Sequence, residues 1–257
     1  LCIVTHENMT GQGTPQKRFQ QRFQRGLRKG FPTGVKRTVV VHSGKGGVGK
    51  TFVAVNIARA LADNGLKVGL LDADIDCPNA LKTLEMDGDL IANAEKKIIP
   101  LEKDGLKAVS MAPLLGGEHE ALLWRGPRLS RAVEQLVHDT DWGELDFLIV
   151  DAPPGTSDVP LSILQVLEGA EMLLVTTPQD TAVMDAMRSA KMAQRLKIDV
   201  IGVIENMAGV VFGEGGGERL AKGLGVPLLA SILLKAEFAK GARPESISNM
   251  ANQNIFQ

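Results

Sequence analysis

The chain has 257 residues, 44% of them hydrophobic and 23% charged, with a formal net charge of −1. These values are ordinary for a globular protein, and the length suffices for one large α/β domain with a sizeable core. No apolar run approaches the roughly 18 residues of a membrane span, and no secretory signal is recognisable. Two cysteines, Cys2 and Cys77, cannot form a disulfide framework, so the reducing cytoplasm is the expected compartment.

The first feature along the chain is a basic segment, residues 14–37, with eight Lys or Arg residues and no acid. Phe19, Phe23 and Leu27 recur every four residues within it, so a helix would carry one apolar stripe among positive charges. Such a helix could contact nucleic acid, a membrane or a protein partner, or target an organelle. We favour a connector helix that packs on the main domain, because three apolar residues make a short stripe for a membrane.

The next feature is the glycine-rich stretch HSGKGGVGKT. Gly44, four further residues, Gly49, Lys50 and Thr51 match the pattern of a phosphate-binding loop. In such a loop the backbone N–H groups surround phosphate oxygens, the lysine reaches the β- and γ-phosphates, and the hydroxyl group ligates Mg²⁺. We therefore expect ATP and Mg²⁺ to be bound by Gly44, Lys45, Gly46, Gly47, Val48, Gly49, Lys50 and Thr51.

The residues that flank this loop support the same interpretation. The β-branched run of residues 37–41 predicts a buried parallel strand before the loop. After the loop, Val53, Ile57 and Leu61 at helical spacing predict a helix, and Gly65 is a suitable stop at its carboxyl end. Strand, loop and helix occur in the order that turns the positive end of the helix toward bound phosphates.

Beyond this unit, strand-like and helix-like segments alternate. Strands are expected at residues 67–74, 106–112, 147–153, 171–177, 199–206 and 227–233. Helices are expected at residues 127–139, 180–196 and 216–224. The alternation predicts an α/β fold whose mostly parallel sheet is covered by helices on both faces. Together with the phosphate loop, it predicts a three-layer P-loop NTPase. We expect residues 1–35 to form a basic amino-terminal extension, helical or flexible, and residues 36–257 to form a single P-loop ATPase domain.

Polar residues lie at the carboxyl ends of the predicted strands, where open α/β sheets bind their ligands. Asp72 and Asp74 follow one strand, Asp151 ends another, and Glu205 and Asn206 end a third. In P-loop ATPases a carboxylate at the position of Asp151 holds the Mg²⁺ shell, here expected through water. The turn APPGTSD that follows it is rich in proline and glycine and could sense a γ-phosphate.

These motifs together resemble one family. The stretch KGGVGKT, with its early lysine, resembles the phosphate loop of the MinD/ParA-like ATPases. The stretches GLLDADID, WRGP, DFLIVDAPPGTSD, TTPQDTAVMDA, GVIENM and FGEGGGERLAKGLGVPLL are similar to the Mrp/ApbC branch, whose members carry and deliver iron–sulfur clusters. The resemblance covers about residues 36–232. The residues before the loop resemble mitochondrial members, which makes the mitochondrial matrix an alternative compartment.

The resemblance implies roles for three residues. Lys45 would reach across a homodimer to the phosphates on the other subunit, adding positive charge where the transition state gains negative charge. Asp74 would orient or deprotonate the attacking water. Asn206 would read the adenine edge, since its amide both donates and accepts. A homodimer that binds ATP with Mg²⁺ and hydrolyses it slowly is thereby implied.

The chain also departs from the family pattern. Members that bind a bridging cluster have a Cys-x-x-Cys pair shortly after the ENM motif, and two subunits pool four thiolates around one iron–sulfur cluster. Here the stretch ENMAGVVFGEGGGE contains no cysteine. Cys77 lacks ligand spacing and is expected to be a small buried side chain, and the four histidines show no metal-site spacing. These departures argue against an iron–sulfur cluster bound by this chain alone.

Three classes of function remain. The first is an Mrp-type ATPase of iron–sulfur assembly, which works with iron–sulfur apo-proteins or with a cysteine-bearing family partner. The second is a ParA/MinD-like positioning ATPase that uses the basic segment on DNA, a membrane or a protein. The third is a nucleotide-binding protein that has lost its chemistry. The motifs favour the first, and metal and sulfide analysis after anaerobic reconstitution would separate it from the others.

Overall fold

The computed structural model describes residues 32–75, 77–111, 126–252 and 256. Their main feature is an eight-stranded sheet with the order β10-β9-β8-β1-β7-β2-β6-β5. All neighbouring strands are parallel except β5, which pairs antiparallel with β6 at one edge. The strands are β1 (Val35–Ser43), β2 (Val68–Asp72), β5 (Leu101–Lys103), β6 (Leu106–Ser110), β7 (Leu145–Asp151), β8 (Glu171–Thr176), β9 (Asp199–Ala208) and β10 (Leu228–Leu233).

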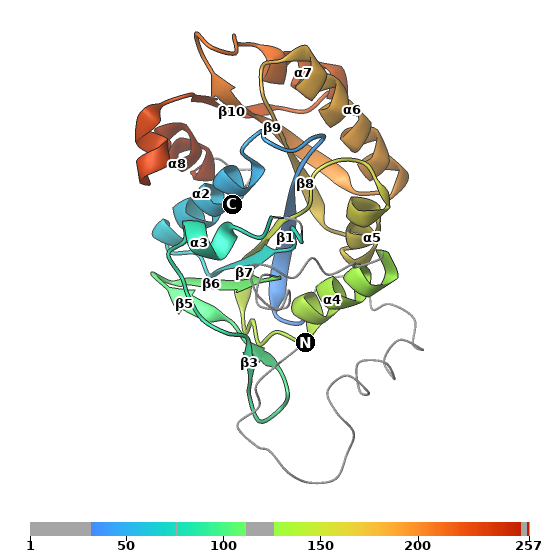
Figure 1. Ribbon diagram of the computed structural model, residues 1–257, viewed down its shortest axis with the longest axis vertical. Helices are drawn as coiled ribbons and strands as arrows, with labels where there is room; N and C mark the ends of the chain where they lie inside the picture. Colours follow the sequence, from blue (N-terminus) through green and yellow to red (C-terminus); the bar gives the residue numbers. More distant parts are fainter. Residues whose placement is uncertain (1–31, 76, 112–125, 253–255, 257) are drawn as a thin grey trace.

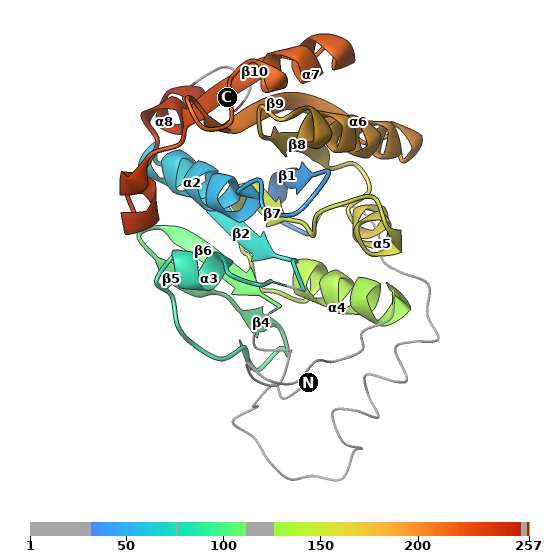
Figure 2. The ribbon, with the colours of Figure 1, turned by 45° about the horizontal axis from the view of Figure 1, so that its top comes forward.

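Helices cover both faces of this sheet (Figures 1 and 2). One face packs against α2 (Lys50–Asp63), α3 (Ala80–Thr83) and α8 (Glu245–Ala251). The other face packs against α4 (Gly126–His138), α5 (Asp158–Val166), α6 (Asp180–Arg195) and α7 (Gly216–Leu224). Along β1 the side chains alternate, so that Val39 and Val41 pack in the first layer and Val40 in the second. The predicted mostly parallel sheet with helices on both faces is confirmed.

The predicted elements lie within a few residues of their expected ends. Helix α7 has the predicted bounds, while α4 is shifted by one residue and α6 ends one residue earlier. Strand β9 continues two residues beyond its predicted end. Gly65 follows α2 with a φ of 80°, the left-handed conformation expected at a helix stop. Within the described ranges, no helix is both long and apolar enough to cross a membrane.

Several short elements were not predicted. They are the two-stranded hairpin of β3 (Ile91–Ala92) and β4 (Ile98–Ile99), the strand β5, the helices α3, α5 and α8, and a 3₁₀ helix, η2 (Ala236–Lys240). The helix expected in the basic segment falls before residue 32, outside the residues that the structure describes. Lys36 and Arg37, at the end of that segment, belong to β1, where they pair with Asp146 and Glu171.

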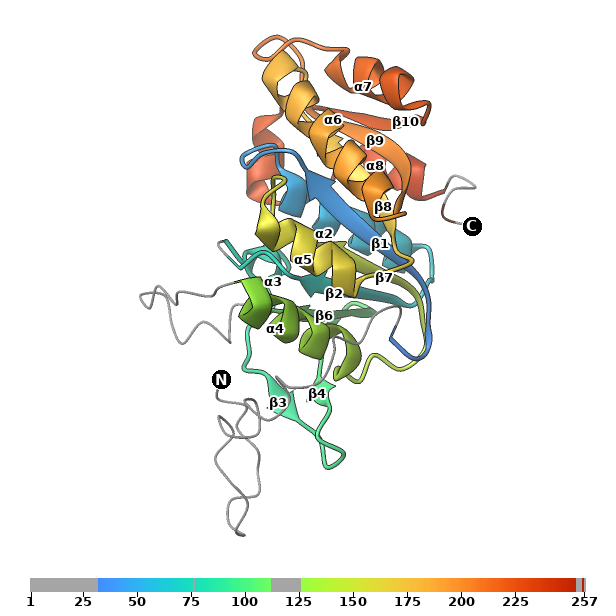
Figure 3. The same cartoon turned by 90° about the vertical axis from the view of Figure 1, so that its right-hand side faces the viewer.

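The loops that carry the predicted site residues project from one edge of the sheet, on the left in Figure 3. This edge holds the carboxyl ends of the parallel strands, because all of them run in the same direction. The loop between β1 and α2, the connection from β2 to α3 and the turn from β7 to α5 therefore meet there. Such an edge is where open α/β sheets bind their ligands.

Candidate nucleotide-binding site

The glycine-rich loop joins the central strand β1 to the buried helix α2. Gly47 and Gly49 have φ values of 80° and 82°, in the left-handed region that favours glycine. Gly44 lies so close to α6 that a Cβ there would be 2.0 Å from the carbonyl carbon of Asp185. No side chain caps the first turn of α2, so its N–H groups face the loop and can bind an anion.

Four predicted site residues meet where this loop passes β7 and β2. The ammonium group of Lys50 lies 2.5 Å from Oδ1 of Asp151 and 3.3 Å from Oδ2 of Asp74. The hydroxyl group of Thr51 donates to Oδ2 of Asp151 at 2.6 Å. Thr51 and Asp151 thus present the hard oxygen ligands that Mg²⁺ prefers, beside a cation that can pair with phosphate. This donor set fits a magnesium–nucleotide complex.

Asp72 is the buried support of this cluster. The strand register places it opposite Asp151 on β7. Its Oδ1 accepts a hydrogen bond from the N–H of Asp74 at 3.2 Å. Its Oδ2 accepts from the N–H of Ala80 at 2.9 Å and from the hydroxyl of Ser110 at 3.2 Å. Asp72 therefore fixes the backbone of Asp74 and the start of α3 at the same time.

The two buried carboxyl groups at the strand ends are electrostatically coupled. Burial raises the pKa of Asp72 to about 7, and the negative charge of Asp151 acts in the same direction. Burial also raises the pKa of Asp151, although the Lys50 ammonium and the Thr51 hydroxyl oppose it. A divalent cation at this end of the sheet would favour the charged form of both groups.

Lys45 is not part of this cluster. Its ammonium group donates to the hydroxyl of Thr181, on the first turn of α6, at 3.3 Å, and the side chain is partly exposed. Among the described residues it forms no ion pair with a carboxylate. The loop therefore carries one lysine directed to its own carboxylates and a second lysine at the surface.

Asn206 lies against the phosphate loop. Its Nδ2 donates to the carbonyl of Val48 at 2.9 Å, and its side chain is buried. A Cβ on Gly49 would lie 2.2 Å from the same nitrogen, so the loop fits around this amide. The contact uses one of the hydrogen-bonding positions of the carboxamide, which also carries an acceptor oxygen. Asn206 thus braces the loop, whatever else its oxygen accepts.

Glu205 and His42 are two further buried polar residues, for which no role was predicted from the sequence. The carboxylate of Glu205 accepts from the N–H groups of Gly217 at 2.8 Å and Gly215 at 3.4 Å, at the start of α7. The Nε2 of His42 lies 3.0 Å from the carbonyl oxygen of Gly155, in the turn after β7. Burial lowers the pKa of His42 to about 4. The sequence pattern that could have pointed to both residues is a polar side chain near the carboxyl end of an apolar strand.

The expectation that Cys77 is buried is wrong. Cys77 is an exposed free thiol in the connection from β2 to α3. Its N–H donates to Oδ1 of Asp74 at 3.4 Å. Among the described residues, no group of three or more His, Cys, Asp or Glu side chains is arranged to hold a metal ion. One thiol does not supply the four ligands of an iron–sulfur cluster.

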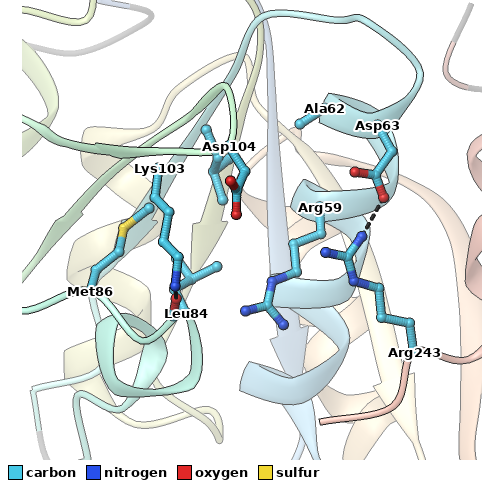
Figure 4. A pocket seen from close by; sticks show the side chains of 9 residues that line it. Arg59, Ala62, Asp63, Leu84, Met86, Lys103, Asp104 and Arg243 are labelled. Atoms are coloured by element: carbon cyan, nitrogen blue, oxygen red, sulfur yellow. Dashed lines mark hydrogen bonds and ion pairs between the residues drawn. The ribbon is translucent and has the colours of Figure 1, made fainter.

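A separate small pocket lies beside α2, near the β5–β6 turn and the segment before α8 (Figure 4). Arg59 donates there to the carbonyl of Thr83 at 3.1 Å, and Arg243 pairs with Asp63. Burial and the positive charge of Arg243 lower the pKa of Arg59. The pocket has a volume of about 20 Å³, which holds little more than one water molecule. None of the predicted site residues lines it.

A glycine loop between a central parallel strand and a helix, with lysine, hydroxyl and aspartate groups gathered beside it, defines the class of P-loop NTPases. Residues 34–255 match the family model described as ParA, the NUBPL iron-transfer P-loop NTPases. The chain belongs to this family.

The names of similar proteins agree with this assignment. The iron-sulfur cluster carrier protein of Deinococcus radiodurans is 44% identical over 238 residues, which are 85% of this chain and 67% of the relative. The iron-sulfur protein required for NADH dehydrogenase, mitochondrial, of Arabidopsis thaliana is 38% identical over 244 residues, 87% of this chain and 78% of the relative.

Solved structures show the same fold. A nucleotide-binding protein from Archaeoglobus fulgidus, in complex with ADP, has a TM-score of 0.71 and 26% identity, covering 94% of this chain and 95% of that one. The cell division ATPase MinD of Pyrococcus furiosus has a TM-score of 0.66 and 24% identity, covering 84% of this chain and 96% of that one. The second likeness concerns the fold alone.

Proposed function

We propose that this protein binds ATP with Mg²⁺ at the glycine loop, hydrolyses it slowly to ADP and phosphate, and uses the cycle in iron–sulfur protein assembly. The observation that carries the proposal is the cluster in which Lys50 and Thr51 share the carboxylate of Asp151. The ADP complex of the Archaeoglobus relative and the names of the carrier proteins support nucleotide binding and the biological setting. A reducing compartment, the cytoplasm or the mitochondrial matrix, is the setting we expect.

ATP binding would rearrange the ion pairs around Lys50. Lys50 exchanges its carboxylate partners for phosphate oxygens, because both are anions and the phosphate is delivered to the N–H groups of α2. This exchange releases Asp74, 3.3 Å from Lys50, to accept a hydrogen bond from the attacking water. Asp151 continues to hold the Thr51 hydroxyl in place. Bound Mg²⁺ would neutralise charge on the phosphate oxygens.

Lys45 completes the site from a second copy of the chain. Two phosphate-bearing sites that face one another repel, so a face-to-face dimer needs cations directed across its interface. Lys45 is at the surface, without an ion pair in the described part of its own chain. A lysine supplied in this way adds positive charge where the transition state gains negative charge.

A mixing experiment tests this arrangement. We expect Lys45→Ala to bind ATP as a monomer and to lose turnover, and Asp74→Asn to bind ATP without turnover. If Lys45 acts in trans and Asp74 in cis, a mixed dimer has one site with both groups intact, and part of the activity returns. Light scattering with a non-hydrolysable ATP analogue reports the dimer. A wild-type chain that stays monomeric, together with mixtures that remain inactive, excludes the trans lysine.

The role in iron–sulfur assembly is proposed to involve a partner. The described residues supply one exposed thiol, Cys77, so the cluster would be held by an iron–sulfur apo-protein or by a cysteine-bearing family member. The nucleotide-driven dimer would then act on that partner. Co-purification of the ATP-bound, hydrolysis-deficient Asp74→Asn protein with a cysteine-bearing family member tests this. Equal recovery of that member with ADP-bound and ATP-bound protein would contradict a nucleotide-driven role.

A further inference from the structure

His42 occupies a core position that the sequence pattern would fill with an apolar side chain. It follows Val41 in β1 and lies on the same face of the strand as Val40, in a layer of apolar residues. Its side chain is fully buried, and its Nδ1 has no hydrogen-bond partner among the described residues. Burial of a polar ring costs free energy unless it is hydrogen-bonded. The hydrogen bond of its Nε2 to the turn after β7 is therefore the feature to explain.

That hydrogen bond fixes the state of the imidazole ring. The Nε2 lies 3.0 Å from the carbonyl oxygen of Gly155, and a carbonyl only accepts, so Nε2 carries the proton. Burial lowers the pKa of the ring to about 4, so the ring is neutral at physiological pH. His42 is thus held as the tautomer with a proton on Nε2 and a bare Nδ1.

The turn that receives this hydrogen bond also touches the phosphate loop. The N–H of Gly155 donates to the carbonyl of Ser43 at 2.8 Å. A Cβ on Gly46 would lie 4.0 Å from Cγ of Pro154. The Ser43 hydroxyl donates to the carbonyl of Lys45 at 2.9 Å. The turn therefore meets the loop at the end that carries Lys45, and not at the start of α2.

We propose that His42 is a positioning residue, whose Nε2–H holds the turn Pro153–Gly155 against the Lys45 end of the phosphate loop. Gly155 has a φ of 93°, and glycine at such a position is conformationally permissive unless its polar groups are held. Its N–H is held by Ser43 and its carbonyl by His42. The inference rests on the proposed ATPase function, because the turn would act on turnover.

Three variants separate the donor from the bulk of the ring. His42→Gln places an N–H at about the reach of Nε2, His42→Asn offers the same amide on a shorter side chain, and His42→Leu removes the donor. We expect the turnover number to fall about tenfold in the Asn and Leu variants, the size of one buried hydrogen bond. The ATP dissociation constant should change little, since the start of α2 is untouched. His42→Gln should recover most of the turnover.

Two measurements test the proposal independently of ATP hydrolysis. Nitrogen-15 NMR of the wild-type ring should show a protonated Nε2 and a bare Nδ1. Hydrogen exchange of the Gly155 amide should accelerate in the Asn and Leu variants and remain slow in the Gln variant, while the Ala152 amide, bonded to Val41, is unchanged. These readouts remain valid if the wild-type chain does not hydrolyse ATP.

The outcomes are decisive in either direction. A ring protonated on Nδ1, or unchanged Gly155 exchange in both the Asn and the Leu variant, overturns the proposal. Equal turnover losses in the Gln and Leu variants would assign His42 a purely structural role and also overturn it. If the Leu variant fails to fold, the wild-type tautomer and the Asn and Gln pair still decide the question.

Discussion

At the scale of single residues, Lys50 stabilises two buried carboxylates as well as the phosphate site. Its removal leaves Asp151 and Asp74 without their cation, and breaking a buried ion pair costs about 3–5 kcal/mol. We expect Lys50→Ala to lose ATP binding in calorimetry and to unfold at a lower temperature. Lys45→Ala is the matched control in the same loop and should keep both properties. Undiminished ATP affinity of Lys50→Ala would exclude this loop as the nucleotide site.

Asp74 is placed to affect turnover more than binding. An amide has almost the same shape as a carboxylate, but it does not take up a proton from water. Asp74→Asn should therefore bind ATP at least as well as the wild type and hydrolyse it roughly 10²–10⁴-fold more slowly. Calorimetry and a phosphate-release assay measure the two quantities. Wild-type turnover in this variant would remove Asp74 from the mechanism.

His42 makes the fold sensitive to acid. Its pKa is about 4 in the fold, below the ordinary histidine value of 6.5, so the unfolded chain takes up the proton first as the pH falls. The stabilisation is complete above pH 6.5 and is lost as the pH falls toward 4, by about 3 kcal/mol in all. Urea unfolding at pH 7 and pH 4.5 should show a larger loss for the wild type than for His42→Gln. The raised pKa of Asp72 increases the stability of the fold as the pH falls, which is opposite to the effect of His42. This contribution is the same in both proteins and cancels in the comparison.

The glycine loop between β1 and α2 was predictable because such a loop is defined by local spacing, while the roles of its residues in binding nucleotide stay predictions. The sequence also placed Asp151 and Asp74 near the loop, because the carboxyl ends of parallel strands share one edge. The direct contact of Lys50 with both carboxylates and the bond from His42 to Gly155 join residues far apart in sequence. No local pattern predicts such contacts. The exposure of Cys77 was missed for a related reason, since burial depends on what the surrounding chain covers.

At the scale of elements, α7 packs tightly against the turn between β8 and α6. A Cβ on Gly216 would lie 2.4 Å from the carbonyl oxygen of Pro178, whereas one on Gly223 would lie 3.2 Å from the flexible end of Met187. Gly216→Ala must displace backbone and should destabilise the fold by about 1–3 kcal/mol. Gly223→Ala should be neutral or stabilising by up to about 1 kcal/mol. Urea unfolding compares them, and equal effects would contradict the close approach.

The long elements were predictable and the short ones were not. Strands such as β1 and β7 are continuous apolar runs because both of their faces are covered. Helices such as α6 have a repeating apolar face over several turns. The antiparallel strand β5 has three residues, and β3 and β4 have two each, which is too short for a periodic signal. Pairing with a neighbour, and not a pattern of their own, defines these elements.

At the scale of the whole molecule, we expect the chain to hold no iron–sulfur cluster by itself, because it has few thiols. The chain has two cysteines, and Cys77 stands alone among the described residues. We expect anaerobic reconstitution to leave iron and sulfide at background levels, equal in the wild type and in Cys77→Ser. ATP binding should be the same in both proteins. Stoichiometric iron and sulfide that is lost in Cys77→Ser would show that two copies hold a cluster through this thiol.

The central place of β1 in the sheet determines when during synthesis the nucleotide site can exist. Val35 pairs with Leu145 on β7 and Val39 with Glu171 on β8, which lie 110 and 132 residues further along the chain. The glycine loop therefore leaves the ribosome long before its strand has a neighbour on either side. Nucleotide cannot guide the early folding of a nascent chain of this kind. It stabilises the protein only once the sheet has closed around β1, by mass action on the finished fold.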